Sequence, residues 1–412
     1  MITAGERRIL RKLAGESAEI GGSALMDRRR KRWRRLNDLE AAGDEPLLLI
    51  YPEGSWREID RHLPLECTGE IARSFELSLR RNLYHHHNFG DDFVINGWFE
   101  TPYFVSDTGW GVEVVKRHSE VETGSWKAVP PLKNLAEDLK KLHFRELSCD
   151  RTLTSQWFET AQETFGDLLP VRRRSDFFWS AGLTREVIDL VGLEEFMLLM
   201  FDDPANLHRL MRFLTDDQRN YMRQLEKLGI VATNNAASHI GSGGPGFTSA
   251  LPEFDGSGRH TFRERWGLLE SQETVGVSPV MFGEFIWPYQ KELAAEFGLL
   301  YYGCCEAVEG RFEYIRQAEN LRAISVSPWS DVRKCTGLYG TDYVLYRKPN
   351  PGHICVEFCE DSIRATIRET LEAAAGCNLA IIAKDLHTVS GDLSRYGRWS
   401  RIVREEIAAV SR

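Results

Sequence analysis

The chain has 412 residues, of which 42% are hydrophobic and 27% are charged, as in an ordinary globular protein. This composition excludes a collagen-like chain, a disordered chain and a small disulfide scaffold. The longest unbroken apolar stretch is the six residues 196–201, far short of the roughly 20 residues that cross a bilayer. We therefore expect no membrane partner.

The net charge of −9 is unevenly distributed, because residues 28–35 (RRRKRWRR) alone carry seven positive charges. The acidic remainder disfavours nucleic-acid binding, which needs positive charge spread along a whole face. The basic run has two interpretations. It forms a solvated helix face, or it docks an acidic partner protein or surface.

The N-terminus has charges where a secretory signal would need an apolar segment, so we expect a cytoplasmic protein. The eight cysteines, two of them adjacent at Cys304 and Cys305, do not predict a disulfide framework in so long a chain. In a reducing compartment, thiols are more often buried, catalytic or metal-bound.

The first part of the chain shows helical patterns. Residues 1–65 are helical and charged, with breaks at 44–46 and 52–55, and we interpret them as a helical N-terminal extension. Residues 67–88 have apolar side chains at helical spacing, which predicts another helix. Residues 184–228 form the clearest helical stretch, and Asp203-Pro204 divides it into at least two helices.

Eight short runs rich in β-branched and aromatic residues predict strands. Most of them are continuous rather than alternating, as strands covered on both faces must be. Helical patterns separate several of them, so residues 66–412 are expected to form an α/β domain, a (β/α)8 TIM barrel, with a doubly wound sheet as the alternative. The eight runs are 93–96, 177–180, 230–233, 266–269, 299–302, 323–326, 343–346 and 379–382.

Polar residues follow the last of these runs at the point where each strand should end. In a parallel barrel this is the carboxyl face, where loops assemble the active site from several strand ends. Side chains 80 positions apart in sequence are therefore expected to meet there. The polar residues in question are Glu270, Gln272, Glu273, Cys304, Cys305, Glu306, Lys348, Asn350, Lys384, Asp385 and His387.

The pentapeptide from Tyr302 to Glu306 (YGCCE) suggests a metal site. Adjacent cysteines alternate in a regular strand, but a strand end can present one thiolate and a neighbouring oxygen to an ion. A carboxylate beside a cysteine is unhelpful in a core and useful at zinc. The alternative is that one of the two thiols is simply buried and the other has no function.

The tetrapeptide from Lys384 to His387 (KDLH) supplies two more candidate ligands after an apolar strand. Asp385 and His387 are two positions apart, so in extended backbone they share a face. A loop salt bridge beside a surface histidine is the alternative. Together the two peptides give the candidate zinc ligands Cys304, Cys305, Glu306, Asp385 and His387.

The glycine-rich segment 241–246 (GSGGPG) lacks the lysine-serine end of a P-loop and the context of a dinucleotide fingerprint. We therefore expect a mobile lid over the barrel mouth rather than a phosphate cradle. The sequence contains no nucleophile-elbow serine and no kinase signature, which leaves metal-assisted or acid-base chemistry.

Several segments resemble the uroporphyrinogen decarboxylase-like superfamily over roughly residues 65–410. They are 277–289 (VSPVMFGEFIWPY), the strand that ends in YGCCE, 348–351 (KPNP) and Lys384-Asp385. The resemblance implies a (β/α)8 barrel, and the superfamily includes a tetrapyrrole decarboxylase and zinc-dependent methyltransferases that use cobalamin. In those methyltransferases a His-x-Cys pair and a later cysteine hold zinc. Here Tyr302 replaces the histidine, Cys304 matches the cysteine and Asp385 falls near the third ligand.

The resemblance favours a methyltransferase that moves a methyl group between a small-molecule donor or thiol and cobalamin, assisted by zinc. The cobalamin could be carried by a corrinoid protein. Glu273 and His239 are candidate proton donors or acceptors, Lys348 and Asn350 are candidates to orient the substrate, and Tyr302 is expected to donate a hydrogen bond.

Two alternatives stay open. The first is a metal-independent decarboxylase or other lyase that acts on a tetrapyrrole or small acid through Lys348, Lys384 and Asp385. The second is a non-catalytic corrinoid-binding barrel. The sequence leaves the oligomeric state open, with a homodimer as one expectation.

Overall fold

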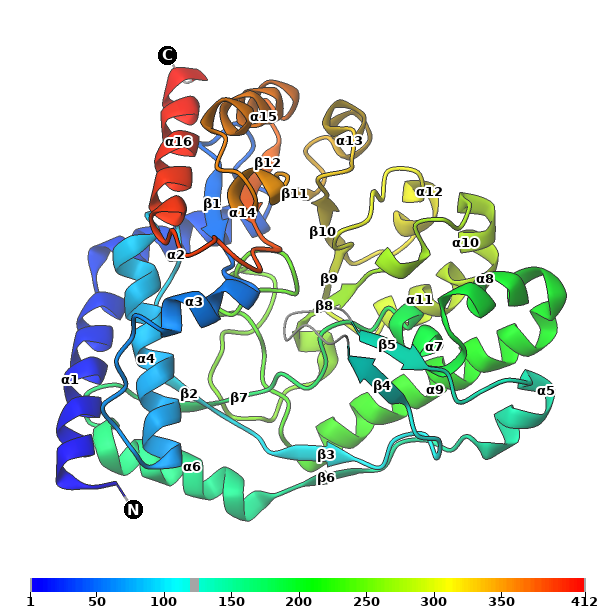
Figure 1. The fold of residues 1–412 in the computed structure, drawn as a ribbon, viewed down its shortest axis with the longest axis horizontal. Coiled ribbons are helices and arrows are strands. Elements are labelled where there is room, and N and C mark those ends of the chain that lie inside the picture. The colour runs from blue at the N-terminus through cyan, green and yellow to red at the C-terminus, as the bar shows by residue number, and fades with distance from the viewer. Residues whose placement is uncertain (1, 119–125, 411–412) are drawn as a thin grey trace.

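The computed structural model describes residues 2–118 and 126–410, and it has an α/β fold (Figure 1). The strands are β1 Leu47–Ile50, β2 Phe99–Pro102, β3 Val105–Asp107, β4 Val115–His118, β5 Trp126–Val129, β6 Leu147–Cys149, β7 Val171–Arg174, β8 Trp266–Leu269, β9 Leu299–Tyr302, β10 Leu321–Val326, β11 Val344–Arg347 and β12 Asn378–Ala383.

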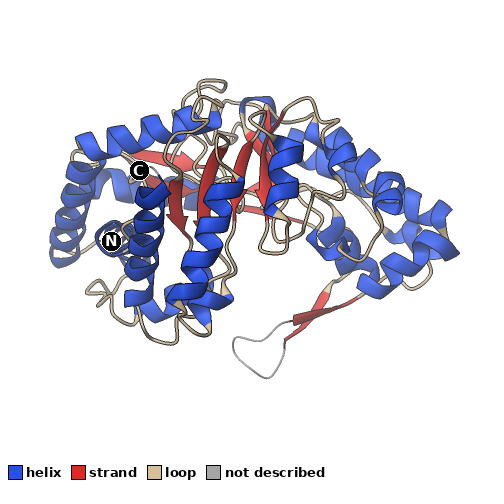
Figure 2. Ribbon diagram, turned by 90° about the horizontal axis from the view of Figure 1, so that it is seen from above, coloured by secondary structure: helices blue, strands red, loops and turns tan. Residues whose placement is uncertain are grey.

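The helices contain most of the remaining regular structure, and Figure 2 shows them around the central strands. They are α1 Ala4–Gly21, α2 Ala24–Asn37, α3 Trp56–Asp60, α4 Glu70–Asn88, α5 Leu135–Asp138, α6 Arg151–Phe165, α7 Thr184–Val191, α8 Leu193–Asp202, α9 Pro204–Leu228, α10 Pro279–Phe285, α11 Trp287–Ala294, α12 Phe312–Ile315, α13 Val332–Tyr339, α14 Gly352–Cys355, α15 Glu360–Ala373 and α16 Ser394–Val410. Among the described residues, no helix is both long and apolar enough to cross a membrane.

The central sheet is parallel and has six strands in the order β1-β12-β11-β10-β9-β8. The last five predicted runs are confirmed as β8 to β12. Their side chains are buried almost throughout, which explains why the runs are continuously apolar. The long helical stretch is also confirmed, and its last helix, α9, begins at Pro204.

The expected helical N-terminal extension, residues 1–65, contains a strand at Leu47–Ile50, between its two predicted breaks. This segment forms β1, which pairs with β12 in register from Leu47 with Ala380 to Ile50 with Ala383. The N-terminal segment therefore completes one edge of the central sheet.

The three remaining predicted strands are wrong, because residues 93–96 and 177–180 are irregular and 230–233 contains a single bridge at Val231. The first case has a clear physical reason. The backbone N–H groups of Leu48 and Ile50 donate to the carboxylates of Asp92 and Asp91, both at 2.9 Å, while the backbone N–H of Asp92 donates to the Leu48 carbonyl at 2.9 Å. The carboxylates thus take two of the hydrogen bonds of a regular strand pair, so the following segment lies beside β1 without forming a strand.

Alternate side chains of the sheet enter two different hydrophobic cores, because successive residues of a strand face opposite ways. Tyr301 and Leu49 belong to an inner core, which also holds α1, α2 and the residues that flank the glycine-rich segment, Ile240 and Phe247. Tyr302 and Leu48 belong to an outer core, formed with α7 to α16. The face of each strand residue therefore decides which part of the molecule it contacts.

The glycine-rich segment 241–246 is not the predicted lid, because it lies inside the molecule and is almost wholly buried. A Cβ added at Gly243 would lie 2.7 Å from the Tyr346 ring, and one at Gly244 would lie 2.5 Å from Trp33. Glycine is needed here so that backbone can approach aromatic side chains closely.

The basic run 28–35 lies in α2, and several of its side chains bind the protein's own backbone and carboxylates. Arg29 donates to the carbonyl of Phe93 at 2.6 Å, and Arg32 lies 3.2 Å from the buried carboxylate of Asp92. Part of this positive charge is thus used within the fold, which neither of the two interpretations predicted.

Candidate functional site

The predicted site residues of three strands meet at the carboxyl edge of the central sheet. Cys304 and Cys305 follow β9, Lys348 follows β11, and Lys384 and Asp385 follow β12. Because all these strands are parallel, the loops after them lie at the same edge. Side chains from distant parts of the sequence are brought together there, as expected.

The two adjacent thiols lie together rather than on opposite faces. Gly303 has a φ of 95°, which turns the chain directly after β9, and the two sulfur atoms are 3.4 Å apart. The Cys305 thiol in turn lies 3.4 Å from the Asp385 carboxylate. Two short contacts therefore connect Cys304 to Asp385.

Lys384 is the cation of this group. Its Nζ lies 3.8 Å from each sulfur, 2.7 Å from Asp385 and 3.6 Å from Glu53. Burial opposes its charge, but the neighbouring Cys304, Glu53 and Asp385 raise its pKa. Burial likewise opposes ionisation of Asp385, yet Lys384 lowers the pKa of that carboxyl. Lys384 is therefore a fixed positive charge beside both thiols.

Lys348 is buried and fixes the Cys304 loop. Its Nζ donates to the hydroxyls of Ser242 at 2.6 Å, Tyr301 at 2.9 Å and Ser325 at 2.9 Å, and to the Cys304 carbonyl at 2.8 Å. Burial lowers the pKa of this ammonium to about 8. Since protein oxygens satisfy the ammonium, Lys348 positions the loop rather than waiting free for a substrate.

The Cys304 thiol has a pKa lowered to about 6. The hydrogen bond from Cys305 contributes most, burial opposes it, and the positive charges of Lys348 and Lys384 favour the thiolate. The pKa of Cys305 is raised for the converse reason, because its thiol donates to the Cys304 sulfur. At neutral pH the pair of cysteines therefore carries one negative charge, and this charge lies on the Cys304 sulfur.

One acidic side chain connects the thiol loop to the loop after β8, and a second lies buried nearby. Both carboxylate oxygens of Glu306 accept backbone N–H groups, from Ser271 and from Cys304, each at 2.9 Å. Glu270 is also buried, and burial together with Glu273 and Glu306 raises its pKa to about 9. At neutral pH Glu306 thus holds the two loops together and Glu270 carries a proton.

An open cavity of about 600 Å³ adjoins the thiols and is lined by Glu273, Cys305 and Glu306, with Trp329 and Arg311 among its other walls. Thr184 donates to the Glu273 carboxylate at 2.7 Å. The cavity gives a small molecule access to Cys305 and to an acidic wall.

Asp385 also belongs to a second donor group, with Glu53 and His387. One ligand atom from each of these three side chains lies within 4.8 Å of the others. Asp385 has a φ of 59° and Glu53 a φ of 47°, a backbone conformation that side chains other than glycine rarely adopt. The predicted proximity of Asp385 and His387 is confirmed, and Glu53 is an addition from the N-terminal segment.

Three predicted catalytic residues make contacts outside the thiol group. Tyr302 faces the outer core, where its hydroxyl donates to Gln290 at 2.7 Å, so it does not contact the thiols. His239 lines a separate cavity and packs on the Tyr51 ring at 4.4 Å. Asn350 accepts the backbone N–H of Gly352 at 2.9 Å and so shapes the start of α14.

Sequence reasoning missed Tyr301, Ser242, Ser325 and Glu53. The strand alternation in β9 gave a usable signal, because if Tyr302 packs on helices then Tyr301 must face the other way. The sequence around Ser242 and Glu53 does not indicate that they are site residues, because the glycine-rich segment and a loop after β1 bring them to the site.

Comparison with known proteins identifies the class of fold. No family model and no curated protein matches the sequence. Comparison with solved structures shows that the chain has a methyltransferase-like fold. It is similar to a methyltransferase from Methanosarcina mazei, with a TM-score of 0.54 and 14% identity, and the match covers 93% of this chain and 99% of the other. At this identity the likeness concerns the fold.

Proposed function

We propose that the protein is a methyltransferase of the uroporphyrinogen decarboxylase-like superfamily, in which the central sheet belongs to a (β/α)8 barrel. Contacts at both edges of the sheet support the barrel. Asp92 N–H donates to Leu48 O beside β1 at 2.9 Å, and Ala181 N–H donates to Leu268 O beside β8 at 3.0 Å. The irregular segments thus continue the layer beyond the six strands.

The proposed reaction moves a methyl group between a small molecule and a cobalamin co-substrate, free or carried by a corrinoid protein. The observation that carries the proposal is the group of two thiols and a carboxylate beside an open cavity at the carboxyl edge. A second support is the fold shared with a methyltransferase.

Zinc fits these donors in chemical type, since it binds thiolates, imidazoles and carboxylates. The two sulfurs are 3.4 Å apart and the Asp385 carboxylate lies 3.4 Å from Cys305, but among the described residues the group whose three ligand atoms all lie within 4.8 Å of one another is Glu53, Asp385 and His387. Both thiols and Asp385 could therefore share one ion only after a rearrangement of these side chains. Cys304, Cys305 and Asp385 would hold it, with His387 or Glu53 beyond Asp385. Bound zinc would lower the pKa of a thiol or polarise the methyl donor.

The protein's own groups supply the proton. When the methyl carbon leaves its donor atom for the nucleophile, the donor atom keeps the bonding electron pair and needs a proton. Glu270 is protonated at neutral pH and neighbours Glu273, which lines the cavity. We assign proton supply to this pair, and to Glu306 the positioning of the Cys304 loop.

A metal-independent lyase is the second candidate, and the position of Lys384 favours it. The Lys384 ammonium lies 3.8 Å from both sulfurs and supplies the positive charge that zinc would otherwise supply there. Zinc binding would require this side chain to move. A lyase would instead use Lys384 to stabilise negative charge that develops on the substrate.

Metal analysis and a methyl-transfer assay test the proposal. We expect about one zinc per chain in the wild type, strongly reduced in Cys304→Ala and unchanged in Cys359→Ala, which removes a cysteine at the start of α15. Reduced cobalamin with a methoxylated donor should show the visible spectral change of methyl-cobalt formation, and methyl-cobalamin with a thiol acceptor should show the reverse change. Absent zinc would refute the metal site, and no change in the cobalt spectrum with any donor or acceptor would favour the lyase.

A further inference from the structure

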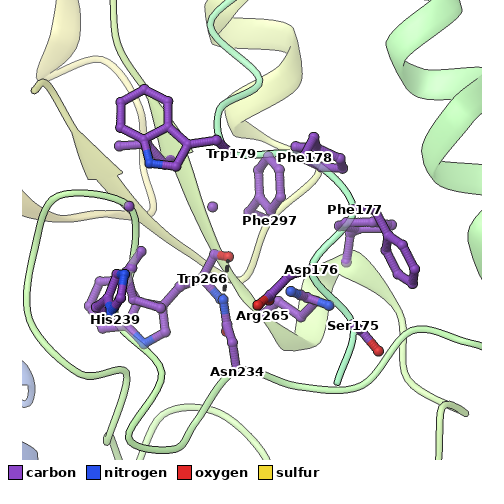
Figure 3. Close-up of a pocket in the computed structure, with 15 residues that line it drawn as sticks. Ser175, Asp176, Phe177, Phe178, Trp179, Asn234, His239, Arg265, Trp266 and Phe297 are labelled. Atoms are coloured by element: carbon purple, nitrogen blue, oxygen red, sulfur yellow. Dashed lines mark hydrogen bonds between the residues drawn. The ribbon is translucent and has the colours of Figure 1, made fainter. Parts of the chain in front are cut away.

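Figure 3 shows a second cavity, of about 370 Å³. Its position relative to the thiol group follows from the strand order. Arg265 directly precedes β8, whereas Cys304 follows β9, the parallel neighbour of β8. Arg265 and Cys304 therefore lie at opposite ends of these two strands, Arg265 at the amino end and Cys304 at the carboxyl end. None of the cavity's lining residues belongs to the thiol group or to the cavity beside it.

Arg265 is the notable group of this cavity. It is 7% exposed, and its Nη1 is buried with no hydrogen-bond partner among the described residues. The guanidinium carbon lies 5.6 Å from the Phe262 ring centre, and burial lowers the pKa of the group to about 10. A buried guanidinium with an unused donor is costly for a folded protein unless something else binds it.

One acidic side chain lies near Arg265, and it is already engaged. Asp176 is drawn beside the guanidinium in Figure 3, while its carboxylate forms an ion pair with Arg174 at 3.1 Å. The side chain of Asp176 is also 54% exposed, so it remains largely in water. Arg265 thus keeps unused hydrogen-bonding capacity at the wall of the cavity that it lines.

The walls around Arg265 are aromatic and fixed. Phe262 stacks on Phe178 at 5.7 Å and contacts Phe297 edge-on at 5.8 Å. The side chain of Asn234 holds both backbone groups of Trp266, at 3.0 Å and 2.9 Å. A small planar molecule would find flat apolar surfaces here with little rearrangement of the protein.

We propose that this cavity binds a small aromatic carboxylate, with its carboxylate on Arg265 and its ring between the aromatic walls. A guanidinium matches a carboxylate in a bidentate geometry, and the cavity volume lies in the range of small-molecule sites. A dianionic phosphate fits less well, because Arg265 offers one positive charge and Asp176 lies close by. This site is independent of the proposed methyl transfer.

Calorimetric titration of the whole protein tests the proposal, with benzoate and 4-methoxybenzoate as probes and benzamide as the neutral match. We expect the carboxylates to bind at one site per chain and benzamide to bind at least about tenfold more weakly, since a charged hydrogen bond is lost. Arg265→Met should weaken carboxylate binding by a similar factor. Arg263→Met, which removes an exposed arginine two positions away, should leave it unchanged.

Thermal unfolding separates a binding role from a structural one. If Arg265 is kept for a ligand, Arg265→Met without ligand should unfold at the same or a higher temperature than the wild type, and benzoate should stabilise the wild type alone. The proposal fails if benzamide binds as well as benzoate, if neither carboxylate binds at millimolar concentration, or if inorganic phosphate displaces them. It also fails if ligand-free Arg265→Met is strongly destabilised.

Discussion

Replacing Lys384 with methionine should raise the pKa of the Cys304 thiol. The ammonium lies 3.8 Å from the sulfur, and a charge pair at about 4 Å is worth about 4 kcal/mol at an effective dielectric constant of about 20. Since one pKa unit corresponds to about 1.4 kcal/mol, this is a ceiling of roughly 3 units. Allowing for relaxation and for Lys348, we expect a rise of at least about 1.

The thiolate can be measured directly by its ultraviolet absorbance near 240 nm, which does not require a reagent to reach the buried sulfur. The signal of metal-free wild type minus that of Cys304→Ser should titrate near pH 6, because the pKa of Cys304 is lowered to about 6. In Lys384→Met it should titrate at higher pH. Lys334→Met, which removes an exposed lysine on α13, should match the wild type.

The reasoning is wrong if the wild-type difference signal titrates near pH 9, as an ordinary thiol would. It is also wrong if Lys384→Met leaves the midpoint unchanged. Folding of each variant can be checked by circular dichroism, so a shifted midpoint cannot be mistaken for partial unfolding.

Three further predictions concern stability. Gly243→Ala should cost about 1–3 kcal/mol, because its Cβ would lie 2.7 Å from Tyr346, whereas Gly310→Ala has free space; equal urea midpoints for the two would contradict this. Glu270→Gln should gain stability over the wild type as pH rises. The pKa of the Glu270 carboxyl is higher in the folded protein than in the unfolded chain, so its contribution to stability is complete below the unfolded pKa and is lost as the pH rises toward about 9. Parallel melting profiles of variant and wild type at pH 6 and 8.5 would contradict this prediction. Glu406→Ala should cost about 1–2 kcal/mol, because its buried carboxylate pairs with Arg364 and Arg368, although Arg368 is 59% exposed and stays hydrated; a melting temperature equal to that of the wild type would contradict it.

The strands that could be predicted are those whose burial produces a recognisable pattern in the sequence. β8 to β12 are covered on both faces, and continuous apolar runs mark them. β1 carries the same signature in Leu47–Ile50, but the charged helices on either side concealed it. Residues 93–96 also look like a strand, and the competing hydrogen bonds of Asp91 and Asp92 cannot be inferred from composition.

The candidate site was predictable where it depends on parallel strand ends, and not where it depends on loops. Cys304, Cys305 and Asp385 follow strands and meet at one edge. The role of Lys348 changed from orienting a substrate to fixing a loop, because Ser242 reaches it through the interior. The facing direction of Tyr302 was decided by the helices that pack against it.

The interior position of segment 241–246 has a consequence for the integrity of the chain. Trp33 and Asn37 of α2 contact this segment, Asn37 donates to the carbonyls of Pro245 and Phe247, and Tyr346 of β11 donates to Asn37. Early, middle and late parts of the polypeptide thus share a single packed centre. Deleting the first 65 residues would leave a void and unpaired carbonyls there, so we expect such a truncated protein to misfold or aggregate rather than yield a smaller folded domain.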